Sequence, residues 1–198
     1  STNKKLGKKV LKGNKKDFKM YTLTLVERST CTNECEHYLT CYGNNMMYAI
    51  RFNPYNKNFL IRLESDIKTI ANKPNNKKGF LLRLHVLGDF YNVDYVLFWK
   101  RMLQLYPNLN IYGYTRNHNN SKYLDKRNIA NEIIKLNTLF STRFYIRFSN
   151  KLDIEESANS IELGKKGITC LAQVDEKKTC ATCTLCWSSK KPINFITH

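Results

Sequence analysis

The feature that most constrains the fold is the alternation of strand-like and helix-like stretches between residues 80 and 148. Asn92 or Asp94 can cap an amphipathic helix that ends before Pro107, and residues 121–139 form a second amphipathic stretch. Strand–helix–strand units with short links need right-handed crossovers. We therefore expect an α/β fold in which a short, mostly parallel, partial-barrel-like sheet is flanked by helices. The strands of this pattern, all rich in β-forming residues, are 80–87, 109–114 and 144–148.

Weaker patterns lie on either side of this region. Residues 21–26 alternate β-forming residues and predict a strand, and residues 167–170 predict a short one. Mixed apolar patterns predict helices over 45–52 and 59–70, and a turn-rich break follows over 72–79. No internal linker divides the chain, so residues 21–198 are expected to form a single α/β metal-binding domain.

Basic residues dominate the charge, which is formally +17. We expect residues 1–20 to form a flexible basic arm that could bind the phosphates of DNA or RNA. Alternatively, the same lysines could belong to a solvated tail. An AT-rich genome also favours the codons of lysine and asparagine, in keeping with the abundant asparagine and the scarce glycine and proline of this chain. The lysines of this arm, set against the single acidic residue Asp17, are Lys4, Lys5, Lys8, Lys9, Lys12, Lys15, Lys16 and Lys19.

Composition excludes several classes of protein. Apolar residues make up 42% of the 198-residue chain and aromatic residues 12%, enough to build a core without disulfide bonds or metal. No apolar run approaches the roughly 18 residues of a membrane-spanning helix, and no signal-peptide pattern begins the sequence. We expect a cytoplasmic protein, in the host cell if the protein is viral. In that reducing compartment, clustered cysteines more often hold metal than form disulfides.

All seven cysteines lie in two short stretches. The C-terminal set is Cys170, Cys180, Cys183 and Cys186, in which the last three have the spacing C-x2-C-x2-C. The same spacing occurs in bacterial ferredoxins, where successive thiolates bind an iron–sulfur cluster. Zinc sites usually combine two separated C-x2-C pairs, and no second pair is present. The spacing favours a [4Fe-4S] cluster with Cys170 as fourth ligand; zinc and metal-free thiols are the alternatives.

The N-terminal set is Cys31, Cys35 and Cys41, with the spacing C-x3-C-x5-C. These residues could hold a second cluster with one open iron that binds a substrate as a Lewis acid. Alternatively, both sets could contribute to one cluster, with some thiols left over. His37 could donate a nitrogen ligand, or it could be a surface residue between its acidic neighbours.

Other candidate residues follow the predicted strands, at the carboxyl edge where parallel α/β sheets gather their functional groups. We expect the cysteine-rich loops to lie at this edge. His85 and Asp89 could point toward the cysteines and position them through hydrogen bonds, although His85 could equally be a satisfied core histidine. Arg116 could hold a phosphate or stack on a base, or be a surface arginine at a strand end. Gly88 would let the backbone approach a ligand closely.

Several of these motifs together resemble the phage "gene product eighty-eight" family. The resemblance covers about residues 22–190 and implies a viral or mobile-element protein, but it names no reaction. A weaker similarity links the chain to radical S-adenosylmethionine enzymes, which carry a C-x3-C-x2-C loop. Cys31 and Cys35 match the first two cysteines of that loop, while Cys41 comes three residues later than the third. The motifs that carry the family resemblance are Thr30-Cys31-x3-Cys35-x5-Cys41-Tyr42, Arg83-Leu-His-Val-Leu-Gly-Asp-Phe90, Tyr112-Gly-Tyr-Thr-Arg116, Cys170-Leu-Ala-Gln173 and Cys180-x2-Cys183-x2-Cys186-Trp187.

The sequence therefore predicts a viral iron–sulfur protein with a redox or catalytic role, whose substrate it does not reveal. The alternative is a nucleic-acid-binding protein in which zinc or a cluster is structural. A zinc-stabilised interaction protein is a third possibility.

Overall fold

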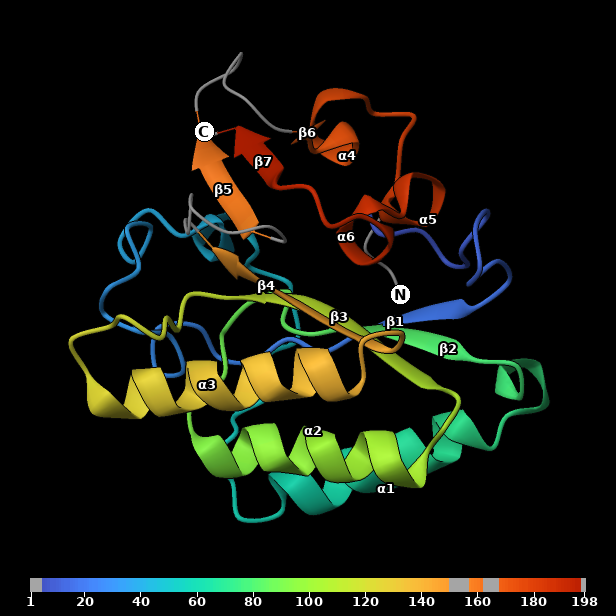
Figure 1. Cartoon of the computed structure of the whole chain (residues 1–198), viewed down its shortest axis with the longest axis horizontal. Helices are drawn as coiled ribbons and strands as arrows, with labels where there is room; N and C mark the ends of the chain where they lie inside the picture. Colours follow the sequence, from blue (N-terminus) through green and yellow to red (C-terminus); the bar gives the residue numbers. More distant parts are fainter. Residues whose placement is uncertain (1–4, 150–156, 162–167, 197–198) are drawn as a thin grey trace.

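A parallel β-sheet organises the chain, as seen in a computed structural model that describes residues 5–149, 157–161 and 168–196 (Figure 1). All neighbouring strands are parallel, in the order β1-β2-β3-β4-β5-β7-β6. This arrangement confirms the predicted α/β fold. The strands are β1 (Lys19–Thr22), β2 (Phe80–Arg83), β3 (Leu109–Thr115), β4 (Phe144–Ser149), β5 (Ser157–Ile161), β6 (Ile168–Thr169) and β7 (Ile193–Ile196).

Three long helices lie side by side beneath β1–β4, and short helices carry the cysteine-rich segments (Figure 1). Among the described residues, none of the helices combines the length and apolar character needed to cross a membrane. The long helices are α1 (Phe59–Ala71), α2 (Val93–Leu105) and α3 (Leu124–Leu139); the short ones are the 3-10 helices η1 (Tyr42–Asn45) and η2 (Pro74–Asn76), with α4 (Leu171–Val174), α5 (Cys180–Cys183) and α6 (Leu185–Ser188).

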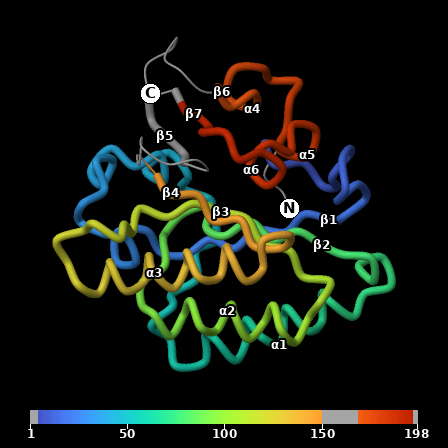
Figure 2. The backbone as a smooth tube through the Cα atoms, viewed as in Figure 1, coloured from blue at the N-terminus to red at the C-terminus, as the bar shows by residue number. Residues whose placement is uncertain are grey.

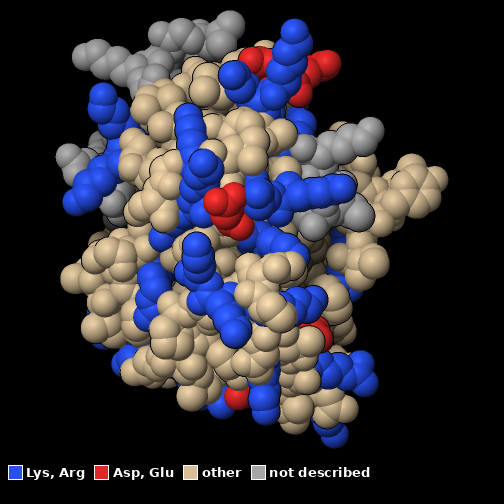
Figure 3. Space-filling model, turned by 90° about the vertical axis from the view of Figure 1, so that its right-hand side faces the viewer, with Lys and Arg blue, Asp and Glu red and all other residues tan. Residues whose placement is uncertain are grey.

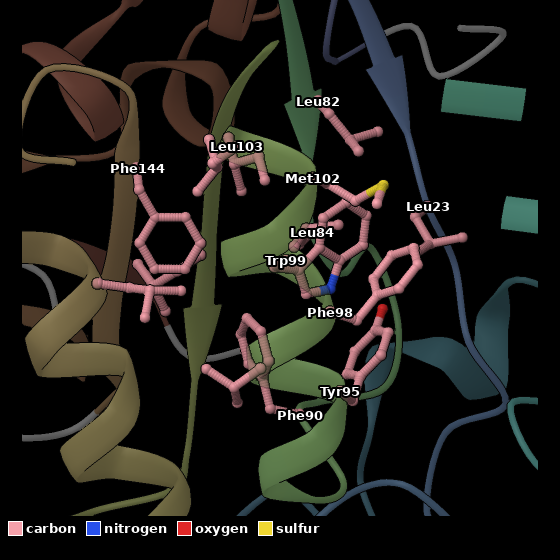
Figure 4. Close-up of a cluster of buried hydrophobic side chains, with 14 of the residues drawn as sticks. Leu23, Leu82, Leu84, Phe90, Tyr95, Phe98, Trp99, Met102, Leu103 and Phe144 are labelled. Carbon is pink, nitrogen blue, oxygen red and sulfur yellow. The ribbon is translucent and has the colours of Figure 1, made fainter. Parts of the chain in front are cut away.

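The sheet separates two cores because successive side chains of a strand point to opposite faces. The helix-covered face is fully apolar and packs against α2, whose first turn is capped by Asn92 accepting a hydrogen bond from the Tyr95 amide at 2.8 Å. Figure 4 shows these side chains, which include Leu82, Leu84, Phe90, Tyr95, Trp99, Met102 and Phe144.

The opposite face of the sheet is covered by the two ends of the chain. The N-terminal segment runs beside α5 and α6 (Figure 2), and the Cys180 and Ala181 amides donate to the carbonyls of Lys5 and Leu6. Leu6 and Val10 are completely buried in this second core. The prediction of a flexible arm did not anticipate these contacts: from Lys5 onward the basic segment packs as part of the domain.

One predicted helix is wrong. Residues 45–52 contain no helix beyond the end of η1, and the apolar side chains Met47, Tyr48 and Ile50 are largely exposed. The chain there instead makes a turn at Met47 and Tyr48, and Phe52 exchanges backbone hydrogen bonds with Thr24 and Val26. The local apolar pattern suggested a helix face, but these apolar side chains are left exposed.

Other boundaries shift by a few residues. The strand expected over 21–26 is β1, which begins two residues earlier and ends at Thr22, and the strand expected over 80–87 ends at Arg83. The predicted long helices are present, as are the strands β3, β4 and β6, although Gly167 lies outside the described residues. Neither β5 nor β7 was expected.

Candidate metal centre

Three of the four C-terminal cysteines lie on two single-turn helices joined by one residue, and Cys170 is the N-cap of α4. Thr179 caps α5 in a reciprocal capping box with Thr182. Thr184 adopts a left-handed conformation (φ 67°), which ends α5 and lets α6 begin at the next residue. The C-x2-C-x2-C spacing therefore becomes a tight double turn that carries Cys180, Cys183 and Cys186.

A polar row on the sheet lies beneath this double turn. Arg83 is the register partner of Tyr112, and Tyr114 is the partner of Arg147, so all four side chains project from the face opposite the long helices. The Tyr112 ring packs against Trp187 with centroids 4.7 Å apart. The Tyr114 hydroxyl donates to the Cys186 sulfur at 2.8 Å. Parallel sheets usually bury apolar side chains on both faces, so this polar row is unusual.

Arg147 holds the cysteine segment on the sheet. Its side chain is 2% exposed, and its guanidinium donates to the carbonyls of Cys186, Leu185, Lys191 and Ser189, the first three at 3.0, 3.2 and 3.1 Å. These carbonyls belong to α6 and to the segment that follows it, and the Leu185 carbonyl also accepts from the Ser189 amide. One buried cation thus fixes the backbone on both sides of Cys186.

The thiols of the C-terminal set interact with one another. Burial and, next, the neighbouring Cys180 raise the pKa of Cys186 to about 12. Burial also raises the pKa of Cys170, with Cys180 again the next cause. For Cys180 burial raises the pKa, while the Arg83 guanidinium opposes the rise. These shifts favour the protonated form of the thiols.

The N-terminal cysteines lie in the loop that follows β1 at the carboxyl edge of the sheet. Gly88 has a φ of 84°, and a Cβ there would lie 2.7 Å from both Leu25 Cβ and Thr30 Oγ1. The close approach that the sequence suggested at Gly88 is therefore made by the protein itself. It seats Thr30, immediately before Cys31, against the end of the β2 loop.

Two glutamates fasten this loop to the segment after β3. Ser121 Oγ donates to Glu34 Oε2 at 2.5 Å, and the Arg116 guanidinium pairs with Glu36 at 3.1 Å. The pair that includes Arg116 is partly exposed and contributes little to stability by itself. Together the contacts hold the loop that carries Cys35 over the edge of the sheet.

Asp89 is the buried carboxyl group of this edge. It accepts hydrogen bonds from Thr115 Oγ1 at 2.8 Å and from the amides of Arg116 and Phe90, both at 2.7 Å. Burial raises the pKa of Asp89 to about 6, and these hydrogen bonds oppose the rise. Burial raises the pKa of Cys31 to about 12, with Asp89 as the next cause. Asp89 therefore lies near enough to Cys31 and Cys35 to raise their pKa, while its hydrogen bonds go to Thr115, Arg116 and Phe90.

His85 lies elsewhere. Its ring packs in the helix-covered core, 4.8 Å from the Phe90 ring, and its Nε2 lies 3.0 Å from the Tyr95 hydroxyl. Burial lowers the pKa of His85 to about 3, so the ring is neutral. Of the two readings of the sequence, the core histidine is the one that this position favours. His37 is exposed on the N-terminal loop.

The structure groups the cysteines by set. All seven are free thiols, and within each set the thiols are near enough to affect one another's pKa. In the described part of the chain, no three cysteine, histidine, aspartate or glutamate side chains are arranged so that they could hold a metal ion. The donor chemistry fits an iron–sulfur cluster, since thiolates are its usual ligands. Loading a cluster requires the thiols to draw closer together.

Comparison with known families now gives a firm result. A sequence profile described as Gene product 88 matches residues 1–189, which is nearly the whole chain. The chain belongs to the Gene product 88 family. The weaker resemblance to radical S-adenosylmethionine enzymes receives no support from the comparisons. Neither a curated protein nor a solved structure shows significant similarity to this family member.

Sequence reasoning missed the structural importance of Arg83 and Arg147. Arg147 proves to be buried. The available signal was the placement of arginine and tyrosine at alternating positions of three strands, where a buried parallel sheet would carry apolar residues. The signal is visible in Phe80-Leu-Leu-Arg83, Tyr112-Gly-Tyr114 and Phe144-Tyr-Ile-Arg147.

Proposed function

We propose that this Gene product 88 protein binds a [4Fe-4S] cluster through Cys170, Cys180, Cys183 and Cys186. The observation that carries the proposal is the double turn α5–α6, which sets the C-x2-C-x2-C thiols on a polar face of the sheet and is fastened there by Arg147. The Tyr114 hydroxyl at Cys186 and the Arg83 charge at Cys180 are what a thiolate-bound cluster needs, because both stabilise negative charge on sulfur.

The N-terminal set gives this proposal its catalytic or redox element. Cys31, Cys35 and Cys41 could hold a second cluster with one open iron, which supplies a Lewis acid when bound. Asp89 and Arg116 lie near this set, so a carboxyl group and a cation border the position of a substrate. The family resemblance supports a viral origin, and a role in the cytoplasm of an infected host cell accords with the cysteine chemistry.

Anaerobic purification followed by iron, sulfide and zinc analysis tests the proposal. We expect a brown protein with about four iron atoms for each cluster and an electron paramagnetic resonance signal after reduction. Cys180→Ser should remove the C-terminal cluster, whereas Cys31→Ser should remove only iron held by the N-terminal set. The matched control is Lys190→Ala, an exposed change close to the cysteines. A colourless protein with stoichiometric zinc would refute the cluster and favour a structural zinc site.

A basic surface favours nucleic-acid binding as a second candidate function. Figure 3 shows the side of the molecule where β2 begins, on which Lys and Arg greatly outnumber Asp and Glu. An open hollow of about 390 Å³ on the described surface is lined by Lys16, Lys77 and Lys78, with Asp17 as its acidic member. Asp17 is already paired with Lys9 at 2.8 Å. The lysines around this hollow form a surface suited to a phosphate backbone.

Charge reversal tests this second function better than deletion of the arm, because deletion would remove the buried Leu6 and Val10. The triple change of Lys16, Lys77 and Lys78 to Glu should weaken binding of single-stranded DNA and RNA at least tenfold and flatten its salt dependence. Lys135→Glu on α3 is the control, since Lys135 is exposed and lies outside the basic hollow. Equal binding by both variants would refute a role for this surface.

A further inference from the structure

Arg83 is a partly buried cation between the two cysteine sets. The charged or ionisable groups that most affect it are Tyr112, Tyr42, Tyr114 and Cys180, and none of these is a carboxylate. Among the described residues its buried Nε has no hydrogen-bond partner. The guanidinium lies over the Tyr114 ring, 5.7 Å from the centroid. Arg83 therefore carries a charge that the described part of the protein does not neutralise.

Two other buried or partly buried arginines are used differently. Arg147 donates to main-chain carbonyls, and Arg51 pairs with Glu27 at 2.7 and 3.0 Å while donating to three further carbonyls. Both are structural fasteners whose donors are satisfied within the protein. Arg83 has no such role, and burying an unpaired charge costs several kcal/mol.

A second unsatisfied donor lies beside Arg83. The Tyr112 side chain is 1% exposed, and its hydroxyl, which lies near the Cys180 thiol, makes no hydrogen bond of normal geometry among the described residues. Tyr112 is the register partner of Arg83 on the neighbouring strand, so the two side chains project together. Tyr42, which follows Cys41, is also within electrostatic range of Arg83 and is half exposed, so this position reaches the surface of the molecule.

We infer that Arg83, Tyr112 and Tyr42 form a binding site for the oxyanion of a small ligand, a carboxylate or a phosphate, between the two cysteine sets. The planar fork of an arginine matches both groups bidentately, and a tyrosine hydroxyl adds a third donor. An anion held here lies on the face of the sheet beneath the α5–α6 double turn, beside Trp187, which packs on Tyr112.

Trp187 provides a local probe of this site. It packs on Tyr112, whereas the other of the two tryptophans, Trp99, lies in the helix-covered core. We would titrate the full-length protein, with its iron content measured in the same sample, with inorganic phosphate and separately with acetate at constant ionic strength. Saturable quenching of Trp187 fluorescence is expected with at least one of them, and comparison of the two identifies the class of ligand. The triple Glu variant of Lys16, Lys77 and Lys78 shows whether phosphate bound at those lysines contributes to the signal.

Substitutions connect the signal to Arg83. Arg83→Met should raise the apparent Kd at least tenfold, and Tyr112→Phe, which removes only the hydroxyl, should raise it severalfold. Arg101→Met is the matched control, because Arg101 is an exposed arginine on α2 paired with Glu64, and it should leave the Kd unchanged. Arg83→Lys keeps the charge but loses the fork, and it should bind more weakly than the wild type.

Either of two results would overturn the inference. One is the absence of a saturable response to both anions in the wild type. The other is an unchanged Kd in Arg83→Met or, if circular dichroism shows that variant unfolded, in both Arg83→Lys and Tyr112→Phe. Anion binding at Arg83 is measured in samples of known iron content. A protein that does not bind the anion can therefore be told apart from a protein that has not assembled a cluster.

Discussion

Replacement of Arg147 by methionine tests whether one buried cation holds the cysteine segment on the sheet. The change keeps most of the aliphatic stem and removes the donors to the carbonyls of Cys186, Leu185, Lys191 and Ser189. A hydrogen bond to a charged group contributes about 1.5–3 kcal/mol, and such losses are not additive within one network. We therefore expect the free energy of unfolding to fall by about 3–5 kcal/mol.

Hydrogen exchange locates the effect. The amides of residues 185–191 should lose protection in Arg147→Met, while those of α2 should lose protection only to the extent that global stability falls. Urea unfolding followed by tryptophan fluorescence gives the change in free energy. Arg101→Met is the control and should cost less than about 1 kcal/mol, since its ion pair is exposed. A loss below about 1 kcal/mol in Arg147→Met, with unchanged exchange, would refute the reasoning.

Three further predictions concern other parts of the fold. The folded-state pKa of His85 is about 3 against a usual value of 6.5, so only the unfolded chain takes up this proton as the pH falls below about 6.5. Below that pH the free energy of unfolding should decline by about 1.4 kcal/mol per pH unit more in the wild type than in His85→Gln. Equal slopes for the two proteins in urea unfolding at several pH values would contradict this. Gly113→Ala would place a Cβ 1.7 Å from the Leu84 carbonyl oxygen. The free energy of unfolding, followed by thermal melting, should therefore fall by at least about 3 kcal/mol. A fall below about 1 kcal/mol would show that the two strands separate easily. Arg51→Met releases the loop that follows Cys41, so a thiol reagent should modify Cys41 several times faster; an unchanged rate would show that other contacts hold the loop.

The central part of the fold was readable because its signals are local. The Asn92 cap and the periodic apolar face of α2 specify that helix without reference to the rest of the protein. In residues 45–52 the local pattern misled, because the apolar side chains there are exposed and the backbone pairs with the segment after β1. The strand β5 has the polar sequence Ser-Ala-Asn-Ser-Ile and exists through its pairing with β4 and β7. No local pattern could have revealed it.

The candidate site likewise contains residues that the sequence placed correctly and residues that it did not. Asp89 and Arg116 were predicted from their positions after strands, and the structure brings both to the N-terminal cysteines. His85 was proposed by the same reasoning but packs in the opposite core. The prediction that His85 lies near the end of a strand was correct. The face of the sheet toward which its ring points depends on the path of the chain after Arg83.

By itself the sequence determined the parallel α/β fold, the long helices and the grouping of the cysteines, because periodicity, capping and residue spacing act over a few neighbouring residues. Only the tertiary structure decided that the basic N-terminal segment packs beside α5, that Arg147 is a buried fastener and that Arg83 is left without a counter-charge. Those outcomes depend on which side chains meet across the sheet from positions far apart in the chain. Whether a charge is solvated or paired depends on these contacts between distant residues, so it cannot be read from any single segment of the sequence.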